Sequence, residues 1–162
     1  MGPVGKVLEN SVRNALSGKG AHVETTRVFS ALDWRTAGAK PQGAPHSPYQ
    51  VLTHMSYWQQ WVVQWLDGRK PALPTHASGS WPGGVAPDNR SEWEKAVRQF
   101  RVGLAALERG AGEADLLSGP GRKSRLEMLR TIAAHNSYHA GQVVLLRQLL
   151  GKWPPPSGGL TW

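Results

Sequence analysis

The chain has 162 residues and no cysteine, and its 19 Lys and Arg residues exceed its 11 Asp and Glu residues, which gives a formal net charge of +8 at pH 7. This length suits one domain with a sizeable core, and the absence of cysteine excludes disulfides and thiolate metal ligands. The start MGPVGKVLEN lacks the apolar core of a signal peptide and no apolar run reaches the ~18 residues of a membrane span, which favours a cytoplasmic protein.

The positive charge raises the question of a nucleic-acid partner. Basic residues are scattered from Lys6 to Lys152, and the densest group, within residues 122–130, is not interleaved with stacking aromatic residues. This distribution favours a solvated basic surface and argues against a nucleic-acid interface. The eight tryptophans, several of them at helical spacing, indicate core packing and are compatible with a homodimer packed through helices.

The first predicted helix covers residues 3–16, where apolar residues recur with helical period and Pro3 suits the first turn. Two glycines interrupt it, and residues 21–32 are predicted to resume as a second helical piece. Residues 33–46 are rich in Gly, Pro and Ala and are predicted to be a connection without regular structure. The inward side chains expected from the second piece are Val28, Phe29 and Leu32.

The second long helix is predicted over residues 47–66, because Ser47 is a suitable N-cap and Gln50 completes a capping box. Residues 67–90 are rich in Pro and Gly and show no period, which predicts a long surface connection. Such a segment can span the ~30 Å length of a twenty-residue helix, so the helices on either side of it can lie parallel with a crossover between them.

A third helix is predicted from Ser91, with Glu94 closing a capping box, to near residue 110, and a fourth over residues 124–151. Ser124 and Glu127 cap the fourth helix, and the glycine and prolines that follow it end it. No stretch alternates with a strand's period of two. The sequence therefore predicts an all-α fold, a four-helix bundle that forms one domain over residues 1–162 and ends in a Pro/Gly-rich tail, residues 152–162.

Three histidines lie on the apolar stripes of two predicted helices: His54 on the second, and His135 and His139, four residues apart, on the fourth. Singly, each is more often a core histidine held by hydrogen bonds than a ligand. Together they predict a site for a divalent transition metal, and three protein ligands leave coordination positions open, as in catalytic sites. Imidazole suits zinc, copper, iron and nickel alike.

The motif HNSYH differs from the H-E-x-x-H pattern of metalloproteases, because Asn136 stands where the glutamate base is expected. A metal can nevertheless lower the pKa of a bound water or thiol by itself. Asn136, Tyr138 and Gln142 are candidate helpers, but Tyr138 lies near the margin of the stripe, where packing is its ordinary role. No catalytic residue is assigned.

The other three histidines have weaker patterns around them. His46 precedes a helix cap and His76 lies in the long connection, so both are predicted at the surface. His22 lies in the second helical piece, and its approach to the metal site stays open.

The segments HSPYQVLTHMSYWQQWV and HNSYHAGQVVLLRQLLG, together with the closing WPPPSGG, resemble the DinB/YfiT-like superfamily over most of the chain. The resemblance matches His54 to the family's first metal histidine, and His135 and His139 to its second and third. It implies a four-helix bundle of up-down-down-up order and a nickel, zinc or related ion. Relatives include thiol-dependent S-transferases and a mycothiol-dependent isomerase, whereas this sequence shows no distinctive thiol-binding signature.

The leading hypothesis is a metal-dependent enzyme, a hydrolase or thiol S-transferase, that acts on a small molecule such as a low-molecular-weight thiol and uses zinc or nickel. The alternative is a metal-binding stress or sensor protein without catalysis. The third is a basic helical nucleic-acid-binding module in which the histidines only pack.

Overall fold

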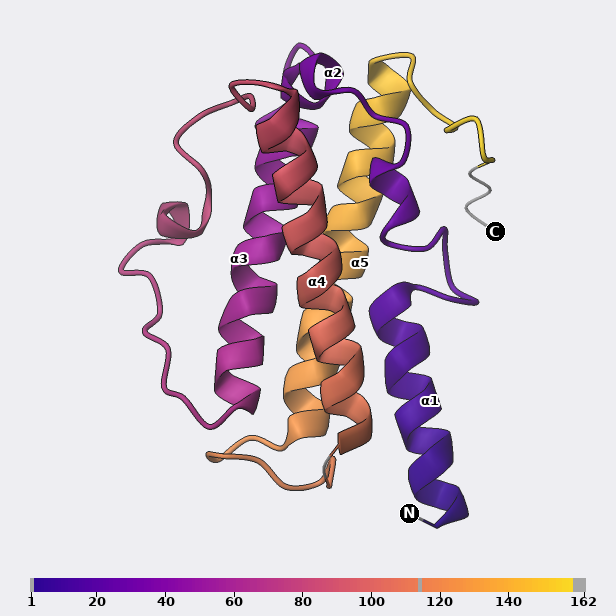
Figure 1. The fold of residues 1–162 in the computed structure, drawn as a ribbon, viewed down its shortest axis with the longest axis vertical. Coiled ribbons are helices and arrows are strands. Elements are labelled where there is room, and N and C mark those ends of the chain that lie inside the picture. Colours follow the sequence, from indigo (N-terminus) through magenta and orange to yellow (C-terminus); the bar gives the residue numbers. More distant parts are fainter. Residues whose placement is uncertain (1, 114, 159–162) are drawn as a thin grey trace.

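The computed structural model describes residues 2–113 and 115–158, and these residues form helices and connections without a strand. Figure 1 shows the long helices side by side as a bundle, in which α1 and α3 each pack against both α4 and α5. The prediction of an all-helical fold is confirmed. In chain order the elements are α1 (Pro3–Ser17), the 3₁₀ turn η1 (Arg27–Phe29), α2 (Trp34–Gly38), α3 (Pro48–Leu66), the 3₁₀ turn η2 (Ala77–Ser80), α4 (Arg90–Glu113) and α5 (Arg125–Leu149).

Two of the predicted capping boxes begin the helices that carry the three histidines. The Ser47 hydroxyl accepts a hydrogen bond from the backbone N–H of Gln50, and the Gln50 side chain accepts one from the N–H of Ser47. Ser124 and Glu127 make the same reciprocal pair at the start of α5. Because each box satisfies N–H groups that a helix start leaves free, it fixes where the helix begins and therefore which residues face inward.

The predicted box at Ser91 and Glu94 is wrong. The helix α4 begins one residue earlier, because the Asn89 side chain accepts a hydrogen bond from the backbone N–H of Glu92 at 3.0 Å. Asparagine is as good an N-cap as serine, so Asn89 can take the role predicted for Ser91. The helix also continues to Glu113, beyond the end predicted near residue 110.

The helical piece predicted over residues 21–32 is also wrong, because only the short turn η1 forms there. The Thr25 hydroxyl donates to the Ser17 carbonyl at 3.2 Å, and the Thr25 N–H bonds to the same carbonyl, which ties the segment back to the end of α1. Conversely, part of the connection predicted over residues 33–46 is helical, because the Asp33 carboxylate caps α2. The side chains of Val28, Phe29 and Leu32 are buried as predicted.

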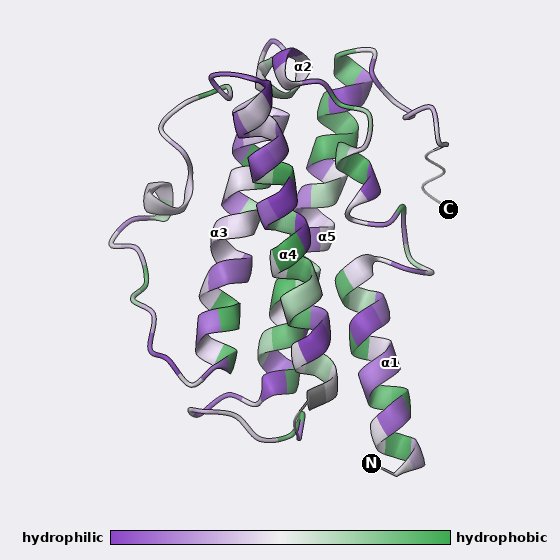
Figure 2. Ribbon diagram, viewed as in Figure 1, coloured by the Kyte–Doolittle hydropathy of each residue, from purple (hydrophilic) through white to green (hydrophobic). Residues whose placement is uncertain are grey.

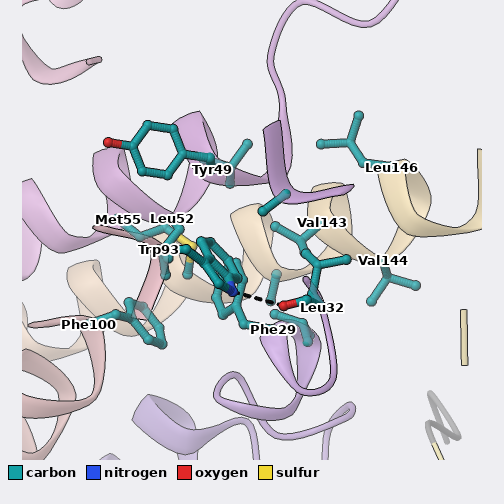
Figure 3. Close-up of a cluster of buried hydrophobic side chains, with 14 of the residues drawn as sticks. Phe29, Leu32, Tyr49, Leu52, Met55, Trp93, Phe100, Val143, Val144 and Leu146 are labelled. Atoms are coloured by element: carbon teal, nitrogen blue, oxygen red, sulfur yellow. Dashed lines mark hydrogen bonds between the residues drawn. The ribbon is translucent and has the colours of Figure 1, made fainter. Parts of the chain in front are cut away.

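The core consists of two apolar clusters, one toward each end of the bundle. Figure 3 shows the first, in which the Trp93 indole N–H donates to the Leu32 carbonyl at 2.8 Å. Gln59 of α3 and Asn136 of α5 lie between the clusters along their helices, and both side chains are fully buried without a hydrogen-bond partner among the described residues. Three tryptophans lie at helical spacing on α3, where the sequence indicated core packing, and they are only partly buried: Trp58, Trp61 and Trp65.

Polar and apolar residues alternate around the helices in Figure 2, as expected for helices with one face in a core. Among the described residues, no helix combines the length and the apolar character that a bilayer crossing requires.

Arg147 contradicts the prediction that the basic residues form a solvated surface. It lies on α5, its side chain is 1% exposed, and burial lowers its pKa. The guanidinium donates to the carbonyls of Val28 at 2.7 Å, Ser30 at 3.1 Å and Lys152 at 3.0 Å, and it faces the Trp153 ring. It thereby ties the η1 segment and the start of the C-terminal tail to α5. The last residues of the predicted tail, 159–162, lie outside the described residues.

Candidate metal centre

The structure brings His54 of α3 together with His135 and His139 of α5. One ring nitrogen from each histidine lies within 4.8 Å of the other two. The Nε2 atoms of His54 and His135 are 3.2 Å apart. The two apolar stripes thus meet at one place in the bundle, as the helical spacing predicted.

In two of these rings, a hydrogen bond determines which ring nitrogen carries the proton. The Nδ1–H of His54 donates to the carbonyl of Ser80 at 3.2 Å, and the Nδ1–H of His139 donates to the side-chain oxygen of Gln142 at 2.7 Å. Both partners are acceptors, so in the neutral imidazoles Nε2 carries a free electron pair. Metal-binding histidines in proteins are oriented by the same kind of outer hydrogen bond.

Trp81, from the connection between α3 and α4, covers one face of His54. Its ring is stacked on the His54 ring, with centroids 3.9 Å apart and planes 8° apart. His46 stacks on the indole at 3.6 Å and 11°. The connection was predicted to be a surface segment, but Ser80 and Trp81 extend from it to the histidines, and no periodicity marked them in the sequence.

The histidines lie in surroundings that disfavour a positive charge. Burial, and then the neighbouring His139, lower the pKa of His54 to about 4. Burial and the same neighbour lower the pKa of His135 to about 4, and burial also lowers the pKa of His139. The rings are therefore neutral at pH 7, which is the form that binds a metal.

This shift predicts that the metal-free protein loses stability on mild acidification. Between pH 6.5 and about 4 the unfolded chain binds protons on His54 and His135 that the folded chain does not, so the free energy of unfolding falls as the pH falls through this range. We expect a loss on the order of 2 kcal/mol between pH 7 and pH 5, measured by urea unfolding. The matched chain His54→Gln/His135→Gln should show a clearly smaller loss, and equal losses in the two chains would contradict the assignment.

The donor set fits a transition-metal ion. Two imidazole nitrogens bound at ~2.0 to 2.1 Å in a tetrahedral site lie about 3.3 Å apart, close to the 3.2 Å between His54 Nε2 and His135 Nε2. The Nδ1 atom of His135 is buried and has no hydrogen-bond partner among the described residues. Three neutral nitrogen donors and no thiolate are suited to zinc, nickel, copper or iron.

The remaining histidines are placed as follows. His22 does not belong to the three-histidine group; its Nε2 lies 2.9 Å from the Ser137 hydroxyl and its Nδ1 lies 2.7 Å from the Val23 carbonyl. His76 is exposed, as predicted. The surface position predicted for His46 is wrong, because this ring is half-buried against Trp81.

Of the three candidate helpers, Gln142 accepts a hydrogen bond of 2.7 Å from a site histidine, His139. Asn136 is fully buried in the bundle. The packing role predicted for Tyr138 is wrong, since this residue is 66% exposed and its ring meets His139 only edge-on, with centroids 5.0 Å apart. Helical periodicity placed Gln142 one turn beyond Tyr138 but could not show that its amide turns back toward His139.

An all-helical bundle that gathers three imidazoles from two of its helices has the fold and donor set of a helical metal-binding protein. The sequence model of the DinB superfamily matches residues 20–143, which is most of the chain. The chain therefore belongs to the DinB superfamily, as its two histidine segments suggested. No curated protein and no solved structure matches the chain.

Proposed function

We propose that the protein is a metal-dependent enzyme, a hydrolase or thiol S-transferase, whose ion is held by His54, His135 and His139. The proposal is carried by the convergence of the three neutral imidazoles, two of which have Nε2 left free by hydrogen bonds at Nδ1. When bound, a divalent ion such as zinc or nickel supplies a Lewis acid that lowers the pKa of a coordinated water or thiol. Three protein ligands leave room for such a molecule.

The chain's own residues have positioning roles in this proposal. The Ser80 carbonyl and the Gln142 amide hold the Nδ1 protons of His54 and His139, which keeps each Nε2 directed at the common point. Trp81 shields one face of His54 from water. A lower local dielectric strengthens the interaction of the ion with its ligands and with a bound anion.

The proposal includes the up-down-down-up helix order that the family resemblance implies. Support comes from the path of residues 67–89, which run from the lower end of α3 to the upper end of α4 in Figure 1. Two helices joined in this way can lie parallel.

A turnover screen with and without a chelator tests the enzymatic proposal. The zinc-loaded or nickel-loaded protein is assayed for ester and amide hydrolysis and for transfer of a low-molecular-weight thiol to an electrophile. We expect turnover that a chelator abolishes, that His54→Ala lacks and that the exposed-site control His76→Ala retains. Stoichiometric metal without any turnover would contradict the enzymatic proposal and support a metal-binding stress or sensor protein.

A further inference from the structure

A cavity of about 380 Å³ lies beside the three histidines. One of its lining residues contacts the histidine group directly, because Gln142 accepts the hydrogen bond from His139. A second, His46, is connected to the group through Trp81, which stacks on both His46 and His54. The cavity and the candidate metal centre are therefore adjoining parts of one region.

The walls of this cavity are mainly apolar, with Gln42, His46 and Gln142 as their polar side chains, and none of the described residues that line it is Asp, Glu, Lys or Arg, although the chain as a whole has a net charge of +8. Part of one wall is the outer face of α5, where Leu145 is 55% exposed and Leu149 is 61% exposed. Gln142, Leu145 and Leu149 share one stripe of this helix, which leads away from His139. Exposed leucines that line a hollow, and not a convex surface, indicate a ligand site.

The volume limits what the cavity can hold. A cavity of about 150 Å³ accommodates one benzene ring. The cavity of about 380 Å³ therefore has room for roughly two rings, or for an alkyl chain of comparable volume.

We propose that this cavity binds an uncharged alkyl or aryl group of the molecule whose polar end reaches the three histidines. The inference rests on the proposed function and narrows its substrate class to molecules with an apolar arm. Leu145 and Leu149 are the residues that select this arm, and Gln142 marks the boundary between the apolar cavity and the histidines.

The neutral two-ring fluorophore 1-naphthylamine tests the cavity without any metal. We expect it to bind the metal-free protein one to one. In competition with the fluorophore, 1-hexanol should show an affinity at least about tenfold higher than that of ethanol, since each buried methylene raises the affinity about fourfold. In the Leu145→Gln/Leu149→Gln chain, the affinities for the fluorophore and for 1-hexanol should both be at least about tenfold lower. Val4→Gln/Val7→Gln, which changes two exposed aliphatic residues of α1, should leave them within about twofold.

Equal affinity in the two double variants, or no dependence on the length of the alcohol, would overturn the inference. Sedimentation of the same chains tests the alternative that a second copy of the chain covers this apolar face. If the native chain is a dimer that does not bind the fluorophore and Leu145→Gln/Leu149→Gln is a monomer, a second copy covers these leucines and the inference is wrong.

Thiols test the link between the cavity and the candidate metal centre. If one molecule occupies both, bound zinc should raise the affinity of 1-hexanethiol at least about tenfold and leave that of 1-hexanol within about twofold, because only the thiol has a second contact. Zinc binding that leaves the affinity for 1-hexanethiol unchanged would overturn the link. A chain that takes up no zinc but still discriminates between the alcohols would contradict the metal proposal and support the cavity inference.

Discussion

In the His135→Ala chain, bound zinc should fall from close to one ion per chain to less than about a tenth of that value. The replacement removes one of three nitrogen donors and leaves a void beside the Nε2 of His54, which lies 3.2 Å from that of His135 in the native chain. Loss of a mere outer partner of a ligand already costs about 10- to 100-fold in metal affinity, and loss of a ligand should cost more. Elemental analysis after gel filtration in zinc-containing buffer measures the change.

The matched control is His76→Ala, which removes an exposed histidine of the connection between α3 and α4. It should retain the native zinc content. Circular dichroism should show the same helix content in all three chains. If His135→Ala binds as much zinc as His76→Ala does, the three histidines are not the metal ligands.

Replacing Arg147 by methionine should destabilise the protein by about 3 kcal/mol. Methionine keeps much of the side-chain volume but removes the donors to the carbonyls of Val28, Ser30 and Lys152. Hydrogen bonds from a charged donor contribute about 1.5 to 3 kcal/mol each, and carbonyls that stay buried without a donor add a penalty. Urea unfolding measures the difference, and proteolysis after Lys152 should become faster because the tail is no longer tied to α5.

Arg130→Met is the control for this change, because Arg130 lies on the same helix and is exposed. It should alter the free energy of unfolding by no more than about 0.5 kcal/mol. Equal effects of the two substitutions would mean that the buried guanidinium contributes nothing beyond its aliphatic part.

The helices that carry the histidines were predictable because their signals are local. Ser47 with Gln50 and Ser124 with Glu127 satisfy their own helix starts within four residues, so the sequence contains both halves of each contact. The N-cap of α4 lies two residues before the predicted one, because Asn89 is as good a cap as Ser91. The segment after α1 was misjudged because the Thr25 hydroxyl bonds to the end of that helix, a contact that periodicity does not reveal.

The convergence of the histidines followed from two helical stripes, but their surroundings did not. Ser80 and Trp81 come from an aperiodic segment, and only the path of the folded chain brings them to His54. Arg147 was missed for a related reason. Two of its partners are backbone carbonyls of residues 28 and 30, and a carbonyl acceptor leaves no signature in the sequence.

Surface loops commonly accept insertions and deletions, but the connection between α3 and α4 should do so unevenly. An insertion or deletion within residues 69–75 leaves every helix and the η2 turn in place, so the fold should tolerate it. A length change between Ala77 and Trp81 shifts the carbonyl that sets the His54 tautomer and the indole that covers its ring. Tolerance to insertion should therefore end abruptly at η2, at a point in the chain where no helix of the bundle is interrupted.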